Sequence, residues 1–390
     1  MRKAKPITTS RTNTAKGITA FPQSLSQLIN LINLTTSSAH IRLAPTVRIR
    51  PLLITMLAFG LISCSSTQEH AGATLRQTTP ELTASRVTAA FSMTTTLTLQ
   101  RQPKLYFDSN RNNTNYEIYV ANSNGSDPHA LTHDPRYDSW WPQPSPNGAW
   151  IVFYRTPRGI HDRDYGKTSL WRMRTNGTEL REIISNHAYG WQIQGHAEWS
   201  PDSQYLVMFG GAKINPQIWI TTADGTDPIQ ITHRGGTNID PTWSPNGQQI
   251  AFVGCPHSFC LPSSYSIYTM YSDGSDLRRL TDNSLENHDP SYSPDGKYIA
   301  WLVHTSTNGN AGLGTWNIFV MHADGSDQHD LTNDSAINSR PAWSMDGKNT
   351  ILFFRVTPGK KHWQLFSIPV SGGAMTQLTN VHADSEYPIE

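Results

Sequence analysis

Short apolar runs recur at similar spacing along most of this chain, and each is followed by a run in which apolar and polar positions alternate. The apolar runs lie at residues 105–107, 150–153, 205–209, 250–253, 298–302 and 351–354. Continuous apolar runs of this length, bounded by turns, predict strands buried on both faces. The alternating runs lie at residues 117–120, 169–173, 217–220, 266–270, 317–320 and 364–368. They predict a second, half-buried strand in each unit.

Two kinds of tight turn separate these runs. A Ser-Pro-Asn/Asp-Gly sequence, or a relative of it, precedes the apolar run at residues 145–148, 200–203, 244–247, 293–296 and 344–347. Proline presets φ and glycine accepts a positive φ, so this sequence predicts a turn. Asn-Gly, Asp-Gly or, in the last unit, Gly-Gly follows each alternating run, which is typical of a hairpin. The pattern therefore predicts four antiparallel strands in each unit of about 50 residues.

Units of this kind predict an all-β fold, a six-bladed β-propeller of four-stranded blades over residues 104–390. The first unit begins with its second strand, because no Pro-x-Trp-Ser-Pro segment stands directly before residue 104. At the other end, Ser-Glu-Tyr-Pro-Ile-Glu at residues 385–390 matches Asn-Ile-Asp-Pro-Thr-Trp at residues 238–243. We therefore expect the carboxyl-terminal strand to pair with the first blade and close the ring.

Composition agrees with a β-protein and narrows the choice of partners. Charged residues make up 16%, aromatic residues 10%, and there are 12 tryptophans with a formal net charge of +1. Tryptophan and tyrosine in this abundance suit aromatic packing between sheets. Because there is no basic excess, nucleic acid is not an expected partner.

The amino-terminal residues have the pattern of an export signal. An 11-residue apolar run at residues 52–62 follows three arginines and is too short to span a bilayer. The run ends in Leu-Ile-Ser-Cys64, which resembles the lipobox of bacterial lipoproteins. That resemblance implies lipidation of Cys64, and an ordinary cleaved signal with an incidental cysteine is the alternative.

The export pattern divides the chain into three parts. Residues 1–63 are interpreted as a leader and lipoprotein signal peptide, and residues 64–103, rich in Ser, Thr and Ala, as a disordered tether. Residues 104–390 form the propeller. The lipobox resemblance implies a location in the periplasm, anchored by lipid to the outer membrane of a Gram-negative bacterium.

Phrases within the repeats resemble the TolB-type propeller family. They include Asn-Ile-Phe-Val-Met-His-Ala-Asp-Gly-Ser at residues 317–326 and Pro-Ser-Tyr-Ser-Pro-Asp-Gly at residues 290–296. The resemblance covers residues 104–390 and implies the propeller fold. TolB proteins carry an α/β domain before the propeller and bind the peptidoglycan-associated lipoprotein. Only 39 residues separate Cys64 from residue 104, so that domain is not expected here, and the sequence leaves a Tol–Pal role open.

The repeat register singles out one position in each unit, the residue just before the position that holds Pro in most of the first strands. The six residues at this position are Trp141, His196, Asp240, Asp289, Arg340 and Tyr387. We expect them to encircle the channel entrance on the face that carries the long loops, and to form the binding site. Trp and Arg are favoured at binding hot spots. For Asp240 and Asp289 the alternative is capping of the strand start.

Two other features concern possible metal or redox chemistry. Ten of the 15 histidines fall in the expected long-loop face, but no HExxH or other tight ligand spacing is present, so no metal is expected. Cys255 and Cys260 flank four residues of one long loop, and in an exported protein they predict a disulfide.

The leading functional interpretation is a binding scaffold rather than an enzyme. The chain has no Gly-x-Ser-x-Gly motif and no carboxylate cluster of obvious purpose, so no catalytic residue or cofactor is expected. The expected partner is an envelope protein or a glycan, bound by a monomer whose only membrane contact is its lipid anchor. The alternative is a metal-dependent polysaccharide lyase. Oligogalacturonate lyases have similar repeats and a histidine-bound metal at the channel, and Gln194-Gly-His196 is the local sequence that hints at such a site.

Overall fold

The computed structural model describes residues 103–390, apart from residues 113–114, 234, 258–259, 283–284, 307–313 and 358. The predicted leader, Cys64 and the predicted tether lie outside the described residues. Within the described part of the chain, no helix has the length and apolar character needed to cross a lipid bilayer.

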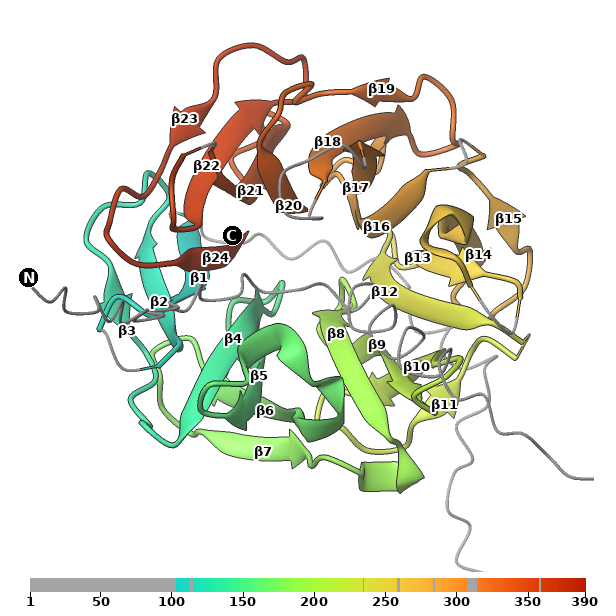
Figure 1. Ribbon diagram of the computed structural model, residues 1–390. Helices are drawn as coiled ribbons and strands as arrows, with labels where there is room; N and C mark the ends of the chain where they lie inside the picture. The colour runs from blue at the N-terminus through green and yellow to red at the C-terminus, as the bar shows by residue number, and fades with distance from the viewer. Residues whose placement is uncertain are drawn as a thin grey trace, which may run out of the picture.

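Four-stranded antiparallel units are arranged around a central axis, as Figure 1 shows in a view along that axis. The strands nearest the axis, here called the inner strands, are β4 (Tyr137–Pro144), β8 (Ile193–Trp199), β12 (Thr237–Trp243), β16 (Glu286–Tyr292), β20 (Ile337–Trp343) and β24 (Ser385–Ile389). Their neighbours are β1 (Lys104–Ser109), β5 (Trp150–Pro157), β9 (Tyr205–Gly211), β13 (Gln249–Cys255), β17 (Tyr298–Ser306) and β21 (Thr350–Val356).

The outer half of each unit has one longer and one very short strand. The third strands are β2 (Glu117–Asn122), β6 (Ser169–Arg174), β10 (Gln217–Thr222), β14 (Ser266–Tyr271), β18 (Thr315–His322) and β22 (Gln364–Pro369). The outermost are β3 (His129–Ala130), β7 (Arg181–Ile184), β11 (Ile229–Gln230), β15 (Arg278–Arg279), β19 (His329–Asp330) and β23 (Thr376–Gln377). Short outer strands limit the exposed hydrogen-bonding edge.

The sheets confirm an all-β propeller of four-stranded antiparallel blades. Four sheets have four strands each, and the fifth has eight, β16 to β23. Within the eight-stranded sheet, one parallel pair, Trp316 with Ile337, joins the set β16–β19 to the set β20–β23. The five sheets correspond to six blades when the eight-stranded sheet is divided into two blades at this parallel pair.

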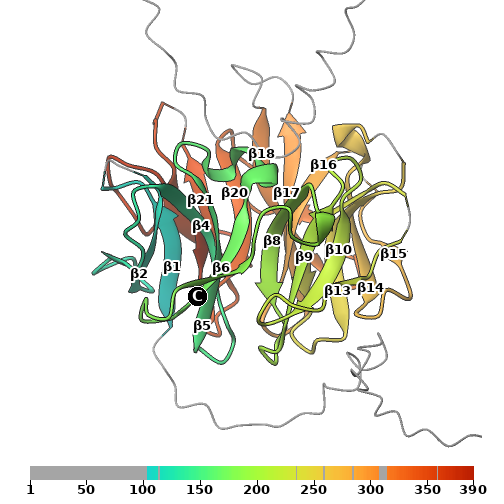
Figure 2. The same cartoon turned by 90° about the horizontal axis from the view of Figure 1, so that it is seen from below.

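The carboxyl-terminal strand completes the first sheet, as predicted. Strand β24 pairs antiparallel with β1, with Ser385 opposite Ser109 and Ile389 opposite Tyr106. The Glu390 carboxylate also accepts hydrogen bonds from Ser344 Oγ at 2.7 Å and Met345 N at 3.0 Å, which tie it to the preceding unit. Figure 2 shows the ring from the side, with the strands running between its two faces.

The repeated Leu-Thr or Ile-Thr ending has a structural role in its own unit. The threonine Oγ1 accepts a hydrogen bond from a third-strand backbone N–H at 2.9–3.0 Å, for example from Ile118 to Thr132 and from Ile318 to Thr332. The same bond occurs at Thr232, Thr281 and Thr379. Each ending therefore holds the outermost segment against the strand beside it.

Neighbouring blades are joined by aromatic packing and by close backbone approach. Trp199 Nε1 donates to the carbonyl of Gln143 at 3.0 Å, and Trp343 Nε1 donates to that of Ser291 at 3.0 Å, each across a blade boundary. The hairpin residue Gly125 has φ +80°, and a Cβ there would lie 2.1 Å from the carbonyl oxygen of Leu378 in the last unit. Only glycine fits both demands.

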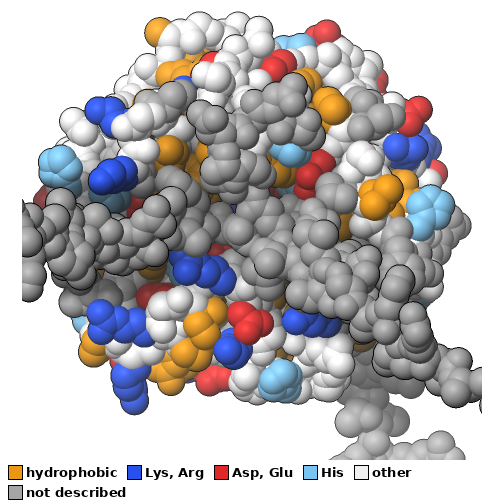
Figure 3. All heavy atoms as spheres, in the orientation of Figure 1, with side chains coloured by type: hydrophobic (Ala, Val, Ile, Leu, Met, Phe, Trp, Pro, Cys, Tyr) orange, Lys and Arg blue, Asp and Glu red, His pale blue; other side chains and the backbone are white. Residues whose placement is uncertain are grey.

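Charged side chains of both signs are interspersed over the face drawn in Figure 3, where lysine and arginine are blue and acidic residues are red. The core lies between the blades and includes the fully buried Trp140, Trp301 and Tyr154. The fold is therefore a rigid scaffold whose inner strands line the axis.

Candidate functional site

The six inner strands share one irregularity, a β-bulge in mid-strand. In each of them the pairing register shifts around an X-Pro dipeptide or, in β8, around His196-Ala197. The first residue of each dipeptide has a positive φ: Trp141 58°, His196 52°, Asp240 51°, Asp289 49°, Arg340 38° and Tyr387 54°. A bulge leaves one residue unpaired and re-aims its side chain. The six side chains, here called the bulge ring, meet near the axis.

The left-handed backbone at these positions is costly for three of the six residues, Trp141, Arg340 and Tyr387. Asp is several-fold enriched in this region of φ, whereas bulky side chains there are outliers. Each bulky residue in this conformation costs on the order of 1–3 kcal/mol and persists only where the surrounding structure enforces it. Because strained residues of this kind cluster at active and ligand-binding sites, the bulge ring is the candidate functional site.

One side of the bulge ring is aromatic and cationic. The Trp141 ring stacks on the His196 imidazole with centroids 3.9 Å apart and planes 8° apart. On the same indole lies the Arg340 guanidinium, its Cζ 3.5 Å from the ring centroid, and the Tyr387 ring packs 5.1 Å from Trp141. Arg340 Nη1 is buried and has no hydrogen-bond partner among the described residues. Its guanidinium is attracted by the more distant carboxylates of Asp289 and Glu198.

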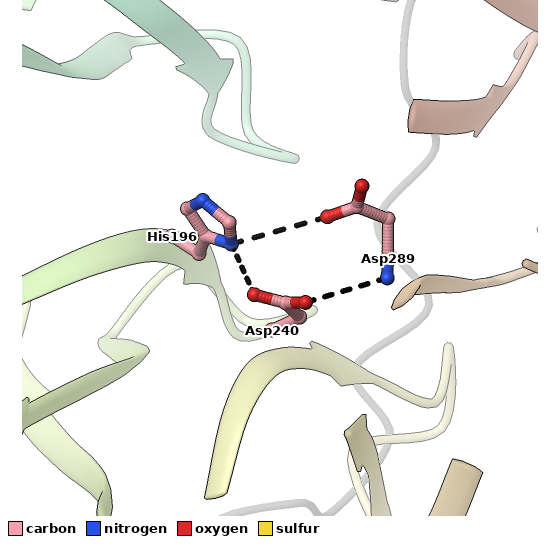
Figure 4. A group of neighbouring side chains, drawn as sticks. All are labelled: His196, Asp240 and Asp289. Atoms are coloured by element: carbon pink, nitrogen blue, oxygen red, sulfur yellow. Dashed lines mark hydrogen bonds and ion pairs between the residues drawn. The ribbon is translucent and has the colours of Figure 1, made fainter. Parts of the chain in front are cut away.

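The other side is acidic and converges on His196, as Figure 4 shows. His196 Nδ1 lies 2.5 Å from Asp240 Oδ1 and 3.9 Å from Asp289 Oδ1. Burial and the neighbouring charge of Asp240 raise the pKa of Asp289 to about 6. Burial alone would raise the pKa of Asp240, but the neighbouring His196 and His288 imidazoles lower it below its ordinary value.

A small pocket lies beside the bulge ring. Trp141, Asp240, Asp289 and Arg340 line it, together with residues two positions further along the inner strands, Gln143, Glu198, Ser291, Ala342 and Ile389. Burial raises the pKa of the Glu198 carboxyl to about 7, although a hydrogen bond from Thr242 acts in the opposite direction. The pocket is therefore lined by one guanidinium, one indole ring and three carboxyl groups.

A chain of alternating acids and imidazoles leads away from the bulge ring. Asp240 Oδ2 lies 3.3 Å from His288 Nδ1, His288 Nε2 lies 3.0 Å from Glu286 Oε1, and Glu286 Oε2 lies 3.5 Å from His304 Nδ1. Burial alone would lower the pKa of His288, but its hydrogen bonds to Asp240 and Glu286 raise it to about 10. This row of acids and imidazoles therefore holds the second carboxylate oxygen of Asp240, Oδ2, in place.

A long loop between β5 and β6 supplies the second support. Its two short 3₁₀ helices, η1 (His161–Arg163) and η2 (Tyr165–Lys167), carry Asp162 and Tyr165 to the axis. The Tyr165 and Tyr387 hydroxyls both donate to Asp162, one to each carboxylate oxygen. The Tyr165 oxygen also lies 2.8 Å from His196 Nε2. This loop therefore orients two members of the bulge ring.

A further buried pair lies where the last strand meets the first. His161 Nε2 is 3.0 Å from Asp108 Oδ2, and the imidazole stacks on Tyr116 with centroids 3.7 Å apart. Burial alone would lower the pKa of His161, but Asp108 and the nearby Glu386 raise it to about 9. Burial raises the pKa of Asp108 to about 6.

The structure brings all six sequence-predicted site residues together, but it corrects their setting. They lie within the inner strands rather than at the entrance, and five are buried, with Asp289 half-buried. Capping of the strand start by the two aspartates is wrong, because β12 begins at Thr237 and β16 at Glu286, each three residues earlier. Cys255 and Cys260 are joined by a disulfide.

Several residues of the site were not predicted from the sequence. Tyr165 and Asp162 lie in a loop without a counterpart in the other units, so the repeat register carried no signal for them. Glu286 and His288 lie in the same strand shortly before Asp289. The alternation of acid and imidazole in Glu286-Asn-His-Asp289 could have indicated them. Glu198 lies two residues after His196, and a carboxyl group at an inner-strand position otherwise expected to be buried could have marked it.

Comparison with known proteins agrees on the fold. The family model of the TolB beta propeller domain (PD40) matches residues 166–311. Among curated proteins, the uncharacterized protein Atu1656 of Agrobacterium fabrum is 26% identical over 148 residues, which are 35% of this chain and 47% of that protein. The match thus spans about half the length of that relative.

Two solved structures extend the likeness over most of the described chain. TolB from Acinetobacter baumannii superposes with a TM-score of 0.58 at 17% identity, over 73% of this chain and 66% of that one. The putative TolB from Agrobacterium tumefaciens superposes with a TM-score of 0.52 at 16% identity, over 73% of this chain and 91% of that one. At these identities the likeness concerns the fold, and in its fold this chain is a TolB-like β-propeller.

Proposed function

We propose that this protein is a binding module that receives a charged segment of an envelope partner, protein or glycan, in the pocket beside its bulge ring. The observation that carries the proposal is the convergence of six left-handed, side-chain-bearing residues on one point of a closed scaffold. Trp141, Arg340 and Tyr387 are side chains that this backbone conformation does not favour, and a ligand site uses the side chains that a bulge aims.

The chemistry of the pocket fits such a segment. Trp, Tyr and Arg are the residues most enriched at binding hot spots, and three of the six ring positions carry them. Arg340 lines the pocket and stacks on Trp141, and its buried Nη1 has no hydrogen-bond partner among the described residues, so the guanidinium has a donor left for a carboxylate or another planar anion. Asp289, half-buried at the pocket, would meet a cationic group of the same segment.

The cellular setting is part of the proposal. The apolar run at residues 52–62 and the Leu-Ile-Ser-Cys64 sequence favour export and lipid anchoring, and the TolB-like fold is compatible with an envelope location. A lipid-anchored monomer at the periplasmic face of the outer membrane would present the channel to envelope proteins and to peptidoglycan or other glycans.

A capture experiment with matched arginine variants tests the binding role. Tagged full-length protein is cross-linked in envelope fractions, and captured material is quantified for wild type, Arg340→Met and Arg174→Met. Arg174 also stacks on a tryptophan, Trp150, with Cζ 3.7 Å from the ring centroid, but at the outer side of its blade. We expect one partner to be captured by wild type and by Arg174→Met and lost with Arg340→Met. Equal capture by all three proteins would contradict the proposal.

The alternative of a metal-dependent polysaccharide lyase predicts a different result. Purified protein would cleave oligogalacturonate, and His196→Asn would abolish the cleavage. Among the six ring positions His196 is the single histidine, so the ring itself supplies fewer imidazoles than a histidine-bound lyase metal would require.

A further inference from the structure

The geometry points to a divalent transition-metal site formed by His196 Nδ1, Asp240 Oδ1 and Asp289 Oδ1, open to the pocket beside the bulge ring. These three atoms lie within 4.8 Å of one another. The inference goes beyond the proposed function, because a metal can bind here whether or not a partner protein or glycan does.

The first argument concerns the proton on His196. Tyr165 has one hydroxyl proton, and it is donated to Asp162, which also accepts from Tyr387. The Tyr165 oxygen is therefore left to accept at His196 Nε2, 2.8 Å away, which assigns the imidazole proton to Nε2. In a neutral imidazole the lone pair then lies on Nδ1, the atom that faces the two aspartates.

The second argument is that buried acceptors face one another. His196 Nδ1 and Asp240 Oδ1 are both buried and lack a hydrogen-bond partner in the described part of the chain, although they are 2.5 Å apart. A lone pair facing carboxylate oxygens at this distance is repulsive unless a positive charge lies between or beside them. A proton on Nδ1 would supply that charge to Asp240 alone, whereas a divalent cation bound to all three atoms also engages Asp289 Oδ1, which lies 3.9 Å from Nδ1.

The distances between the three ligand atoms become those of a metal coordination sphere after a small side-chain rotation. In a tetrahedral site with bonds of about 2.0–2.1 Å, ligand atoms lie about 3.3 Å apart. The observed distances from Nδ1 to the two carboxylates, 2.5 and 3.9 Å, lie on either side of this value. A modest rotation of the imidazole or of the carboxylates would therefore equalise them.

The outer contacts are those that metal-bound histidines and carboxylates use. Tyr165 orients the His196 ring through Nε2, and His288 holds the second oxygen of Asp240 at 3.3 Å. Asp240 and Asp289 also line the pocket, so coordination positions on that side are open to water or to a ligand. One imidazole nitrogen with two carboxylate oxygens favours Zn²⁺ or Mn²⁺ over Ca²⁺ and Mg²⁺, which prefer oxygen ligands alone.

Calorimetric titration of metal-stripped, full-length protein with ZnCl₂, MnCl₂, CaCl₂ and MgCl₂ tests the site without any partner. We expect one equivalent of Zn²⁺ or Mn²⁺ to bind more tightly than Ca²⁺ or Mg²⁺. Asp240→Asn and Asp289→Asn keep the shape and tolerate the left-handed backbone, and each should weaken binding by about tenfold or more. Tyr165→Phe keeps the ring packing but removes the acceptor for Nε2–H, and should weaken binding by about 10–100-fold.

A second histidine–aspartate pair provides the control. His362 Nδ1 lies 3.3 Å from Asp384 Oδ1, outside the bulge ring, and His362→Ala should leave metal affinity unchanged. Circular dichroism and thermal melts establish that each variant is folded. Absence of Zn²⁺ and Mn²⁺ binding to wild type, or binding lost only in His362→Ala, would overturn the inference and leave an imidazolium–carboxylate pair in its place. Either result leaves the arginine-variant capture experiment unaffected, so the two proposals fail independently.

Discussion

At the scale of single residues, the bulge ring separates side chains that suit a left-handed backbone from side chains that do not. Aspartate adopts this conformation readily, so Asp240 and Asp289 carry little backbone strain. Trp141, Arg340 and Tyr387 gain nothing from it and are held in place by the packing around them. Their side-chain chemistry, rather than their conformational preference, accounts for their positions.

Replacing Asp289 by asparagine should stabilise the protein at pH 8 in the presence of a chelator. Burial and Asp240 raise the pKa of Asp289 to about 6, so its charged form is disfavoured in the folded state at this pH. The neutral amide removes a penalty of about 1–2 kcal/mol after allowance for partial exposure. Differential scanning calorimetry should show a higher Tm, and a lower one would contradict the electrostatic account of this residue.

The His161–Asp108 pair predicts how stability depends on pH. Because the pKa of folded His161 is raised to about 9 from an ordinary 6.5, the folded state binds this proton more tightly than the unfolded state. The stabilisation that this bound proton gives to the folded state is therefore fully present below about pH 6.5 and is lost as the pH rises through about 9. Asp108, whose pKa is raised to about 6, contributes in the same direction at lower pH.

Urea unfolding between pH 6.5 and 9.5 should thus show a fall in the free energy of unfolding of about 2–3 kcal/mol from this pair. Asp108→Asn should flatten the fall, because it removes the hydrogen-bonded charge that holds the proton on His161. Glu386 and Asp162 also face His161, so a residual slope is expected in the variant. An unchanged slope in Asp108→Asn would refute this assignment.

At the scale of elements, the strands and their order were predictable from the sequence because each depends on local chemistry. The Ser-Pro-Asn/Asp-Gly turns and Asn/Asp-Gly hairpins delimit the strands, and the match between residues 385–390 and 238–243 predicted the pairing of β24 with β1. The bulges were not predicted, because the X-Pro pairs were expected at the strand starts, whereas they lie inside the inner strands, where a Pro is typical of a bulge. The loop carrying η1 and η2 was also beyond prediction, since its contacts to His196 and Tyr387 depend on tertiary packing.

Removal of residues 385–390 should destabilise the whole propeller. The truncation leaves β1 without its inner partner and removes the contacts of Glu390 with Ser344 and Met345. We expect aggregation on size-exclusion chromatography or a Tm lower by more than about 10 °C, since a ring of repeats loses cooperativity when its closure is lost. A soluble monomer that melts like the full chain would show that closure does not stabilise the ring.

The disulfide between Cys255 and Cys260 is expected to act locally. It closes a short loop after β13, so loop-closure entropy gives it roughly 2 kcal/mol. The double variant Cys255→Ser/Cys260→Ser should lower the free energy of unfolding by about that amount, measured by urea unfolding. Because the loop follows β13 and Arg340 lies in β20, in another unit, capture of a partner should persist in this variant. Loss of capture would place the partner on the loop instead.

At the scale of the whole molecule, the ring distributes one site over all of its inner strands. Each side chain of the bulge ring comes from a different inner strand, and the acid–imidazole chain from Asp240 to His304 joins β12, β16 and β17. Closure of the ring therefore assembles the site, and the site in turn places buried charged networks across blade boundaries. Opening the ring should therefore lower both the free energy of unfolding and the affinity for a partner.

Photo-crosslinking from inside the pocket tests the central claim, that a partner enters the channel beside the bulge ring. The photoreactive amino acid p-benzoylphenylalanine is placed at Ser291, which lines the pocket, or at Thr226, which is exposed on an outer hairpin. In cells producing the full-length protein, irradiation should yield a crosslinked species from position 291 and none from position 226, and Arg340→Met should abolish it. Crosslinks from position 226 alone, or a crosslink at 291 that persists in Arg340→Met, would contradict the account.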